Sequence, residues 1–207
     1  MTPGGTFAYT GVEVPPLVRQ AVDLALRLGF ENSCLPETGR LLSTLAGGVA
    51  GGIIGETGTG CGVGLAWLVS GARPGTQLAS VEIDAARASA SQHLFADYPD
   101  VTVLRGDARE LLGRGPFDLL VLDGGGAGKD GEEPVDPDRV LTPGGSLVID
   151  DFSPMTTWPP TLPSGEPDVV RRHWLEHPLL FTAELTIGGQ LHPVSVLVGR
   201  RRPPAST

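Results

Sequence analysis

A glycine-rich stretch after a short apolar run is the part of this sequence best suited to hold a ligand. An acid, Glu56, precedes Thr57, Gly58, Gly60 and Gly62. Glycines at alternate positions let the backbone take positive φ and come close to a ligand that a Cβ would exclude. A helix that begins at residue 63 would direct its free amide groups at the same turn. The stretch therefore predicts a strand, a tight turn and a helix around a bound ligand.

The spacing of these glycines argues against a dinucleotide site. The dinucleotide fingerprint G-x-G-x-x-G requires a third glycine where this sequence has Val63 or Leu65. A carboxylate at Glu56 would repel a pyrophosphate, but it suits a ligand with an ammonium or sulfonium group. In this acid-x-Gly-x-Gly-x-Gly form the sequence resembles the class I S-adenosylmethionine-dependent methyltransferases. The motif alone also fits a glycine-rich turn of another doubly wound protein.

The resemblance implies further cofactor contacts after the next two strands. Glu82 would accept hydrogen bonds from both ribose hydroxyls, and Ile83 follows it in the cofactor site. Asp107, with Ala108, would accept from the adenine amino group. Asp84 and Asp107 each stand before a predicted helix, where Asp is a good N-cap. For Asp107 both roles stay open.

The closest resemblance within the class is to small-molecule O-methyltransferases of the catechol and caffeoyl-CoA kind. It is carried by residues 35–42 together with the glycine turn. Such enzymes hold a divalent cation, usually Mg²⁺, and the matching ligands here are Asp123, Asp150 and Asp151. Three carboxylates at neighbouring strand ends attract a hard cation and repel one another without it. A metal-free role for Asp150 and Asp151, in orienting a substrate or capping a loop, is the alternative.

The catalytic residues implied by the resemblance are Asp123, which also belongs to the implied cofactor site, and Lys129. A metal at Asp123 would hold both oxygens of a vicinal diol-like acceptor and lower the pKa of its hydroxyl. Two features depart from the family pattern. Asp151 stands where Asn is commoner, and Lys129 is displaced beyond the glycine-rich residues 124–128. A flexible loop could still deliver Lys129 to the acceptor as a base, and a surface lysine is the alternative.

Periodicity and turn residues predict an α/β fold. Helices are expected at residues 15–30 and 38–46, ahead of the first strand. After the glycine turn, strands are expected at 77–83, 101–104, 117–122 and 146–149, with helices between them at 85–96 and 108–112. A helix at 169–176 precedes two extended runs, 180–187 and 193–199, around a Gly188-Gly189 turn. The resemblance adds a Rossmann-like, doubly wound, mostly parallel seven-stranded sheet with this hairpin at its C-terminal end and two extra N-terminal helices. Segments 124–133 and 152–167 are expected to be pocket walls or lids.

Length, charge and composition favour one soluble domain. The chain has 207 residues, a mass of 21.5 kDa and a net charge of −9. We expect a single domain over 1–207, with a helical cap at 1–48 and a cofactor-binding core at 49–202. The acidic balance argues against nucleic acid, and no apolar run approaches the ~18 residues of a membrane helix. Cys34 and Cys61 are expected to be buried as small apolar residues, with free thiols, in a cytoplasmic protein.

The sequence thus predicts an S-adenosylmethionine-dependent O-methyltransferase that acts on a small-molecule hydroxyl with help from a divalent cation such as Mg²⁺. The resemblance also favours a homodimer. One alternative is a methyltransferase of the same fold that acts on RNA or protein. Another is a non-catalytic domain that binds the cofactor and serves as an interaction module.

Overall fold

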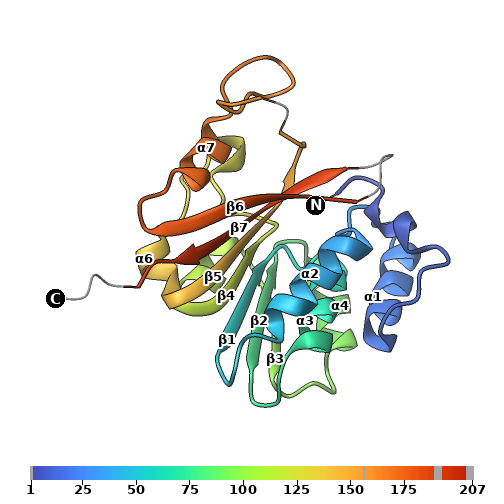
Figure 1. The fold of residues 1–207 in the computed structure, drawn as a ribbon. Helices are drawn as coiled ribbons and strands as arrows, with labels where there is room; N and C mark the ends of the chain where they lie inside the picture. Colours follow the sequence, from blue (N-terminus) through green and yellow to red (C-terminus); the bar gives the residue numbers. More distant parts are fainter. Residues whose placement is uncertain (1, 156, 189–192, 204–207) are drawn as a thin grey trace.

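The core of the protein is one mixed sheet of seven strands in the order β3-β2-β1-β4-β5-β7-β6 (Figure 1). The computed structural model describes residues 2–155, 157–188 and 193–203. Strands β1 to β5 are parallel to one another, while β7 is antiparallel to both β5 and β6. The strands are β1 (Ile53–Thr57), β2 (Gln77–Glu82), β3 (Val101–Arg105), β4 (Phe117–Leu122), β5 (Leu141–Phe152), β6 (Leu180–Ile187) and β7 (Val194–Arg201). The predicted fold is therefore confirmed.

Helices cover both faces of the sheet. The α-helices are α1 (Pro16–Arg27), α2 (Pro36–Ala46), α3 (Val63–Gly71), α4 (Ala85–Leu94), α5 (Ala108–Leu112), α6 (Pro137–Val140) and α7 (Val169–Leu175), and 3-10 turns η1 (Gly5–Tyr9) and η2 (Lys129–Gly131) complete them. Along β4, Leu119 and Val121 join the hydrophobic cluster of α1, α2 and α3, whereas Leu120 and Leu122 join that of α5, α6 and α7. Side chains alternate along a strand, so each face of β4 is buried under its own layer of helices.

Strand β5 and the short elements η1, η2 and α6 differ from the sequence prediction. Strand β5 runs from Leu141 to Phe152 instead of over residues 146–149, because its Pro143-Gly144-Gly145 segment stays in the strand with a register irregularity against β4. The short elements η1 and α6 were not predicted, since five or four residues carry no measurable periodicity. The predicted Gly188-Gly189 turn lies partly outside the described residues, but the hairpin pairing of β6 with β7 is confirmed.

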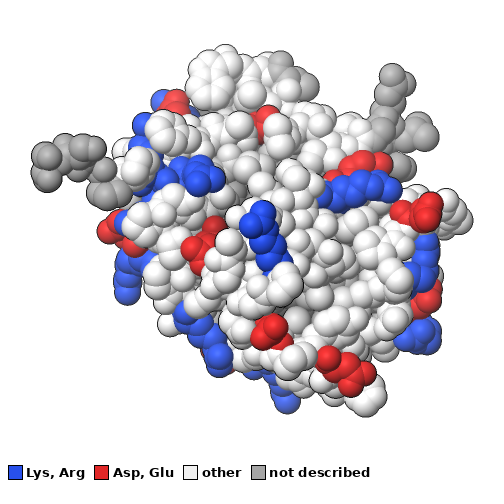
Figure 2. All heavy atoms as spheres, turned by 60° about the horizontal axis from the view of Figure 1, so that its bottom comes forward, with Lys and Arg blue, Asp and Glu red and all other residues white. Residues whose placement is uncertain are grey.

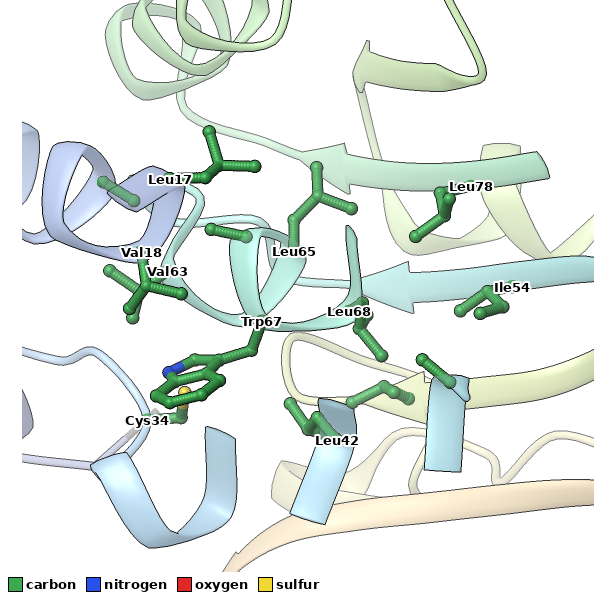
Figure 3. Close-up of a cluster of buried hydrophobic side chains, with 14 of the residues drawn as sticks. Leu17, Val18, Cys34, Leu42, Ile54, Val63, Leu65, Trp67, Leu68 and Leu78 are labelled. Carbon is green, nitrogen blue, oxygen red and sulfur yellow. The ribbon is translucent and has the colours of Figure 1, made fainter. Parts of the chain in front are cut away.

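Helix α3 is the buried centre of the first cluster (Figure 3). Five of its nine residues are buried, including Leu65, Trp67 and Leu68, which fits a helix enclosed by other helices and a sheet. Helices α1 and α2 both pack on it. Because α3 starts directly after the glycine turn, this packing fixes the position of the turn.

The N-terminal segment is tied to α3 by buried hydrogen bonds. The Tyr9 hydroxyl donates to the Cys34 carbonyl oxygen over 3.0 Å and accepts from Trp67 Nε1 over 3.0 Å. Thr6 Oγ1 donates to the Phe30 carbonyl oxygen over 2.9 Å, and the Ser33 amide donates to Thr6 Oγ1 over 3.3 Å. Residues 30–34 are therefore held against the glycine turn by η1 and α3.

Within the described residues, no helix is long and apolar enough to cross a membrane.

Removal of the Tyr9 hydroxyl is expected to destabilise the fold. The Tyr9→Phe variant leaves the Trp67 N–H and the Cys34 carbonyl without this buried partner, at a cost of about 1–3 kcal/mol in the free energy of unfolding. Tyr98→Phe is the matched control, because Tyr98 is half-buried and only its ring packs, edge-on against Phe95. Urea unfolding measures both variants, and equal stability of the two would contradict the anchor role of Tyr9.

Candidate functional site

The predicted site residues meet at the carboxyl edge of the parallel strands. A narrow cleft there separates the glycine turn from residues 30–34, and its free volume of about 10 Å³ is roughly that of one water. The cleft is lined by Phe30, Asn32, Ser33, Cys34, Glu56, Gly58, Thr59, Gly60, Cys61, Val63, Gly64 and Asp123.

Residues 30–34 are the part of the cleft that the sequence analysis missed. They lie in an irregular segment between α1 and α2, which has neither periodicity nor a recognisable motif. The one sequence signal for these residues is their position between two predicted helices that precede the first strand. Both Cys34, in this segment, and Cys61, in the glycine turn, are buried free thiols, as the sequence predicted.

The glycine turn has the tight geometry that its sequence predicted. Gly58, Gly60 and Gly62 all have positive φ, at 85°, 54° and 85°. A Cβ at Gly58 would lie 2.7 Å from the backbone nitrogen of Gly124, so only glycine fits there. Thr57 Oγ1 donates to the Gly125 carbonyl oxygen over 2.9 Å, which joins the turn to the loop after β4.

Glu56 is a buried carboxyl group at the inner end of the cleft. Its Oε2 accepts from the Ser80 hydroxyl over 2.7 Å, and Ser80 contacts Thr59 Oγ1 over 2.6 Å. Burial raises the pKa of Glu56 to about 8; the Ser80 hydrogen bond partly offsets this rise, and the charge of Asp123 adds to it. A cation at this point would stabilise the ionised form, as expected for a ligand with an ammonium group.

Glu82 is buried and already accepts three hydrogen bonds from the protein. Gly60 N donates to its Oε2 over 2.7 Å, while Asp84 N and Arg87 donate to its Oε1 over 2.9 Å and 2.8 Å. A carboxylate accepts about four hydrogen bonds, so these three donors leave capacity for about one more, and the predicted contact of Glu82 with the ribose hydroxyls stays a prediction. Next to Glu82, Ile83 is 72% exposed, and its predicted contact with the cofactor stays a prediction.

Asp84 and Asp107 both cap helices. Asp84 accepts from the amides of residues 86 and 87, over 3.0 Å and 2.9 Å. Asp107 accepts from the Arg109 amide over 3.0 Å and from Arg109 Nε over 2.8 Å, both at Oδ1. The capping role of Asp107 is thus present, and its adenine role stays a prediction. Ala108 is half-buried and begins α5.

The predicted metal ligands Asp123, Asp150 and Asp151 form one acidic cluster. One oxygen from each lies within 4.8 Å of the others. Asp150 is buried, and burial together with the charge of Asp123 raises its pKa to about 7. Asp151 has φ of 64°, a left-handed conformation that Asp and Asn tolerate better than most residues. Three converging carboxylates form a donor set that suits a hard divalent cation.

Lys129 lies at this cluster and not on the open surface. Its Nζ donates to the carbonyl oxygens of Asp150 and Asp151, the latter over 3.1 Å, and lies 4.4 Å from the centre of the Phe152 ring. Burial lowers the pKa of Lys129, and the charge of Asp123 partly offsets that effect. Lys129 is also the only lysine of the 207-residue sequence, in which all other basic side chains apart from histidine are arginines.

Helix α7 fixes the glycine loop that carries Lys129. Trp174 is fully buried, and its Nε1 donates to the Ala127 carbonyl oxygen over 2.7 Å. The Val135 amide donates to the Gly126 carbonyl oxygen over 2.9 Å and closes the loop. Lys129 thus lies at the acidic cluster on a loop that α7 holds in place, and its predicted role as a base stays a prediction.

The segment 152–167 contributes one buried side chain beside the acidic cluster. Phe152 is buried between Lys129 and Arg171, whose Cζ lies 5.1 Å from the ring centre. Trp158 is 61% exposed, so it does not anchor this segment on the sheet. The predicted lid role of the segment stays a prediction.

Known proteins resemble this chain in sequence. A family described as "Methyltransferase domain" matches residues 56–152. A protein of Mycobacteroides abscessus, named provisionally as an O-methyltransferase, is 32% identical over 146 residues, which are 64% of this chain and 64% of that protein. A protein of the same provisional name from Mycobacterium sp. strain JLS is 31% identical over 152 residues, 69% of this chain and 67% of the relative. The chain thus matches about two thirds of the length of these curated relatives.

Solved structures share the fold at low identity. An O-methyltransferase of Bacillus cereus in complex with S-adenosylhomocysteine has a TM-score of 0.72 and 16% identity, with 96% of each chain covered. The O-methyltransferase TomG of Streptomyces achromogenes, involved in tomaymycin synthesis and solved with S-adenosylmethionine, has a TM-score of 0.71 and 18% identity over 95% of this chain and 94% of that one.

The pH dependence of stability should reveal the buried Glu56. Its folded-state pKa of about 8 exceeds the ordinary value of 4.5, so the folded protein holds a proton that the unfolded chain loses between these values. The free energy of unfolding therefore falls as the pH rises through this window. We expect Glu56→Gln to match the wild type near pH 5 and to exceed it at pH 8 by about 2–4 kcal/mol, at ~1.4 kcal/mol per pKa unit.

Urea titrations at several pH values would measure this difference. The exposed Glu110 provides a control, because Glu110→Gln removes the same charge outside the cleft and should not alter the pH dependence. A constant difference between Glu56→Gln and wild type across the window would show that Glu56 is ionised throughout.

The Trp174 anchor should control the accessibility of Lys129. Trp174→Phe keeps an aromatic ring but loses the hydrogen bond to Ala127, so the glycine loop should open and Lys129 should react faster with an amine-acylating reagent. Mass spectrometry of the peptide with the single lysine gives the rate. Trp67→Phe also loses a buried indole hydrogen bond, to Tyr9, and serves as the control. Equal acylation rates in the two variants would contradict the anchoring role.

Proposed function

We propose that this chain, which belongs to the class I S-adenosylmethionine-dependent methyltransferases of the O-methyltransferase type, transfers a methyl group to a hydroxyl oxygen of a small molecule. The observation that carries the proposal is the double position of Asp123. It lines the cleft with Glu56 and Gly58, and it also belongs to the acidic cluster with Asp150 and Asp151. A methyl donor in the cleft and an acceptor at the cluster would therefore meet at Asp123.

The cleft residues fit the parts of the proposed cofactor. S-adenosylmethionine, when bound, supplies a methyl group activated by a sulfonium. Glu56 would face its ammonium group, and Glu82 would accept from a ribose hydroxyl. Ile83 and Ala108 would cover the adenine, with Asp107 accepting from its amino group. The glycine turn supports this fit, because Gly58 and Gly60 line the cleft with positive φ and without a Cβ, which lets a ligand approach the backbone closely.

The acidic cluster fits a divalent cation through the chemistry of its donors. When bound, a cation such as Mg²⁺ would polarise the acceptor hydroxyl and hold two neighbouring oxygens of a diol-like acceptor. Asp123, Asp150 and Asp151 would hold it, and Lys129 would take the proton from the hydroxyl. The acceptor oxygen then forms the C–O bond as the C–S bond breaks, which leaves S-adenosylhomocysteine.

Lysine suits this proton transfer better than arginine does. A buried lysine can lose its proton near neutral pH, whereas a guanidinium stays charged. Burial lowers the pKa of Lys129 in that direction. Its place between the carbonyl groups of Asp150 and Asp151 and the Phe152 ring brings Nζ to the cluster that would hold the acceptor.

The proposal extends to the setting of the enzyme. A small-molecule acceptor agrees with the net charge of −9 and with the mixed acidic and basic side chains on the face in Figure 2, where no continuous basic track is seen. We place residues 1–48 and 49–202 in one domain of a cytoplasmic homodimer. Light scattering on the purified protein tests the dimer, and salt-sensitive binding of tRNA would favour the RNA methyltransferase instead.

Asp150→Asn should separate catalysis from cofactor binding. The variant replaces one carboxyl ligand of the cluster and leaves the lining of the cleft unchanged, so turnover of a catechol-type acceptor should fall about 100-fold or more while affinity for S-adenosylhomocysteine changes little. Radiolabelled methyl transfer over a panel of vicinal diols and calorimetry measure the two effects.

Asp130→Asn is the control for the Asp150 variant, because Asp130 is exposed in the same glycine loop as Lys129 and loses the same charge. Full turnover by Asp150→Asn, or full turnover of the wild type in EDTA, would contradict the role of the metal. Full binding of cofactor with no transfer to any acceptor, in the wild type, would favour the interaction module.

A further inference from the structure

We propose that Lys129 is a built-in counter-cation of the acidic cluster, which stabilises the three carboxylates in the absence of a metal and weakens their affinity for a divalent cation. The inference deepens the proposed function and rests on it, because the cluster is the proposed metal site. It concerns the site before a cation binds, where the nearby carboxylates favour the charged ammonium. The proposed role of Lys129 as a base belongs to the loaded site, where the charge of a bound cation would favour release of the Lys129 proton.

The first argument is the position of the ammonium group. Lys129 Nζ donates to the backbone carbonyls of Asp150 and Asp151, the two residues that supply two of the three clustered carboxylates. A cation bound by these carboxylates would therefore lie close to a second positive charge. In a partly buried site such a repulsion is weakly screened by solvent and salt.

The second argument is that Lys129 cannot easily move away when a metal enters. Its loop is held by the buried hydrogen bond from Trp174 to Ala127, by the Val135–Gly126 backbone bond and by a 3.1 Å bond from the Gly128 amide to Glu132 Oε1. The Phe152 ring contacts the ammonium group on a further side. Relief of the repulsion would therefore require the Lys129 side chain to give up the Phe152 ring and both carbonyl oxygens, because its backbone is held in place.

The third argument is the balance of charge without a metal. Three carboxylates with oxygens within 4.8 Å of one another repel strongly, and Asp150 is buried. Lys129 and the cluster attract each other, so the ammonium offsets part of this repulsion and lowers the cost of assembling the cluster. The same attraction must be weakened when a divalent cation binds, which makes metal binding less favourable than the donor set alone suggests.

The test compares Mn²⁺ binding to variants that differ in charge at position 129. Calorimetric titration with Mn²⁺ at pH 7, without cofactor or acceptor, gives the affinity directly. We expect Lys129→Met to bind Mn²⁺ about tenfold or more tightly than the wild type, while Lys129→Arg, which keeps the charge, stays near the wild type. Arg172→Met removes the same charge from an exposed pair with Glu176 and should not alter the affinity.

A second measurement covers the case in which Lys129→Met fails to fold. Acetylation of the folded wild type removes the charge of its only lysine without refolding, and Lys129→Arg treated in the same way controls for acetylation of the terminal amine. Acetylated wild type should bind Mn²⁺ more tightly than acetylated Lys129→Arg. In EDTA, loss of the charge should lower the thermal stability, and Mn²⁺ should restore it.

Unchanged or weaker Mn²⁺ binding after loss of the charge would overturn the inference. So would the absence of Mn²⁺ binding in every form. A parallel titration with S-adenosylhomocysteine tests the proposed function separately. If the cofactor product binds but Mn²⁺ affinity does not depend on the charge at position 129, the counter-cation role is rejected and the proposed methyltransferase function stands. If Mn²⁺ affinity depends on that charge but S-adenosylhomocysteine does not bind, the proposed function is rejected and the counter-cation role stands.

Discussion

Mutual repulsion among carboxylates at one edge of the sheet is the constraint on which the rest of the site depends. Glu56, Glu82 and Asp150 are buried there, and Asp123 lies between the cleft and the acidic cluster. Such a group is costly unless each acid has donors or cations nearby. The fold supplies them locally: Ser80 for Glu56, three donors for Glu82 and the Lys129 ammonium for the cluster. Burial is the main cause of the raised pKa of Glu56, about 8, and the charges of Asp123 and Glu82 add to it; a cationic ligand would offset this rise.

Two segments outside the parallel core complete the site. Residues 30–34 form one wall of the cleft and are held by Tyr9, Thr6 and Trp67. On the other side, Trp174 of α7 holds the glycine loop of Lys129. The parallel strands thus position the acidic side chains of the site. The elements before β1 form one wall of the cleft, and α7, after β5, holds the loop that positions Lys129. The acceptor would be chosen by these two segments, since both border the point where cleft and cluster meet.

The sequence predicted the parts of the structure that depend on local pattern. Alternation of strands and helices, the glycine turn and the acids at strand ends follow from periodicity and from the rule that ligands bind at the carboxyl edge. The sequence did not show residues 30–34 in the cleft, because their place depends on hydrogen bonds to residues far away in the chain. It also left Lys129 undecided, since the loop that delivers it is fixed by Trp174, 45 residues further along the chain. The role of Asp107 stays open, because one carboxyl group can cap a helix and bind a ligand.

The most direct test of the central claim is a calorimetric titration of the purified wild type with S-adenosylhomocysteine, once with Mg²⁺ and once with EDTA. The account predicts micromolar binding in both buffers, because the cofactor contacts of Glu56 and Glu82 do not require the metal. Thermal stabilisation by the same ligand should accompany the heat of binding. No heat and no stabilisation in either buffer would contradict the assignment of the cleft as a cofactor site, and with it the proposal that methyl donor and acceptor meet at Asp123.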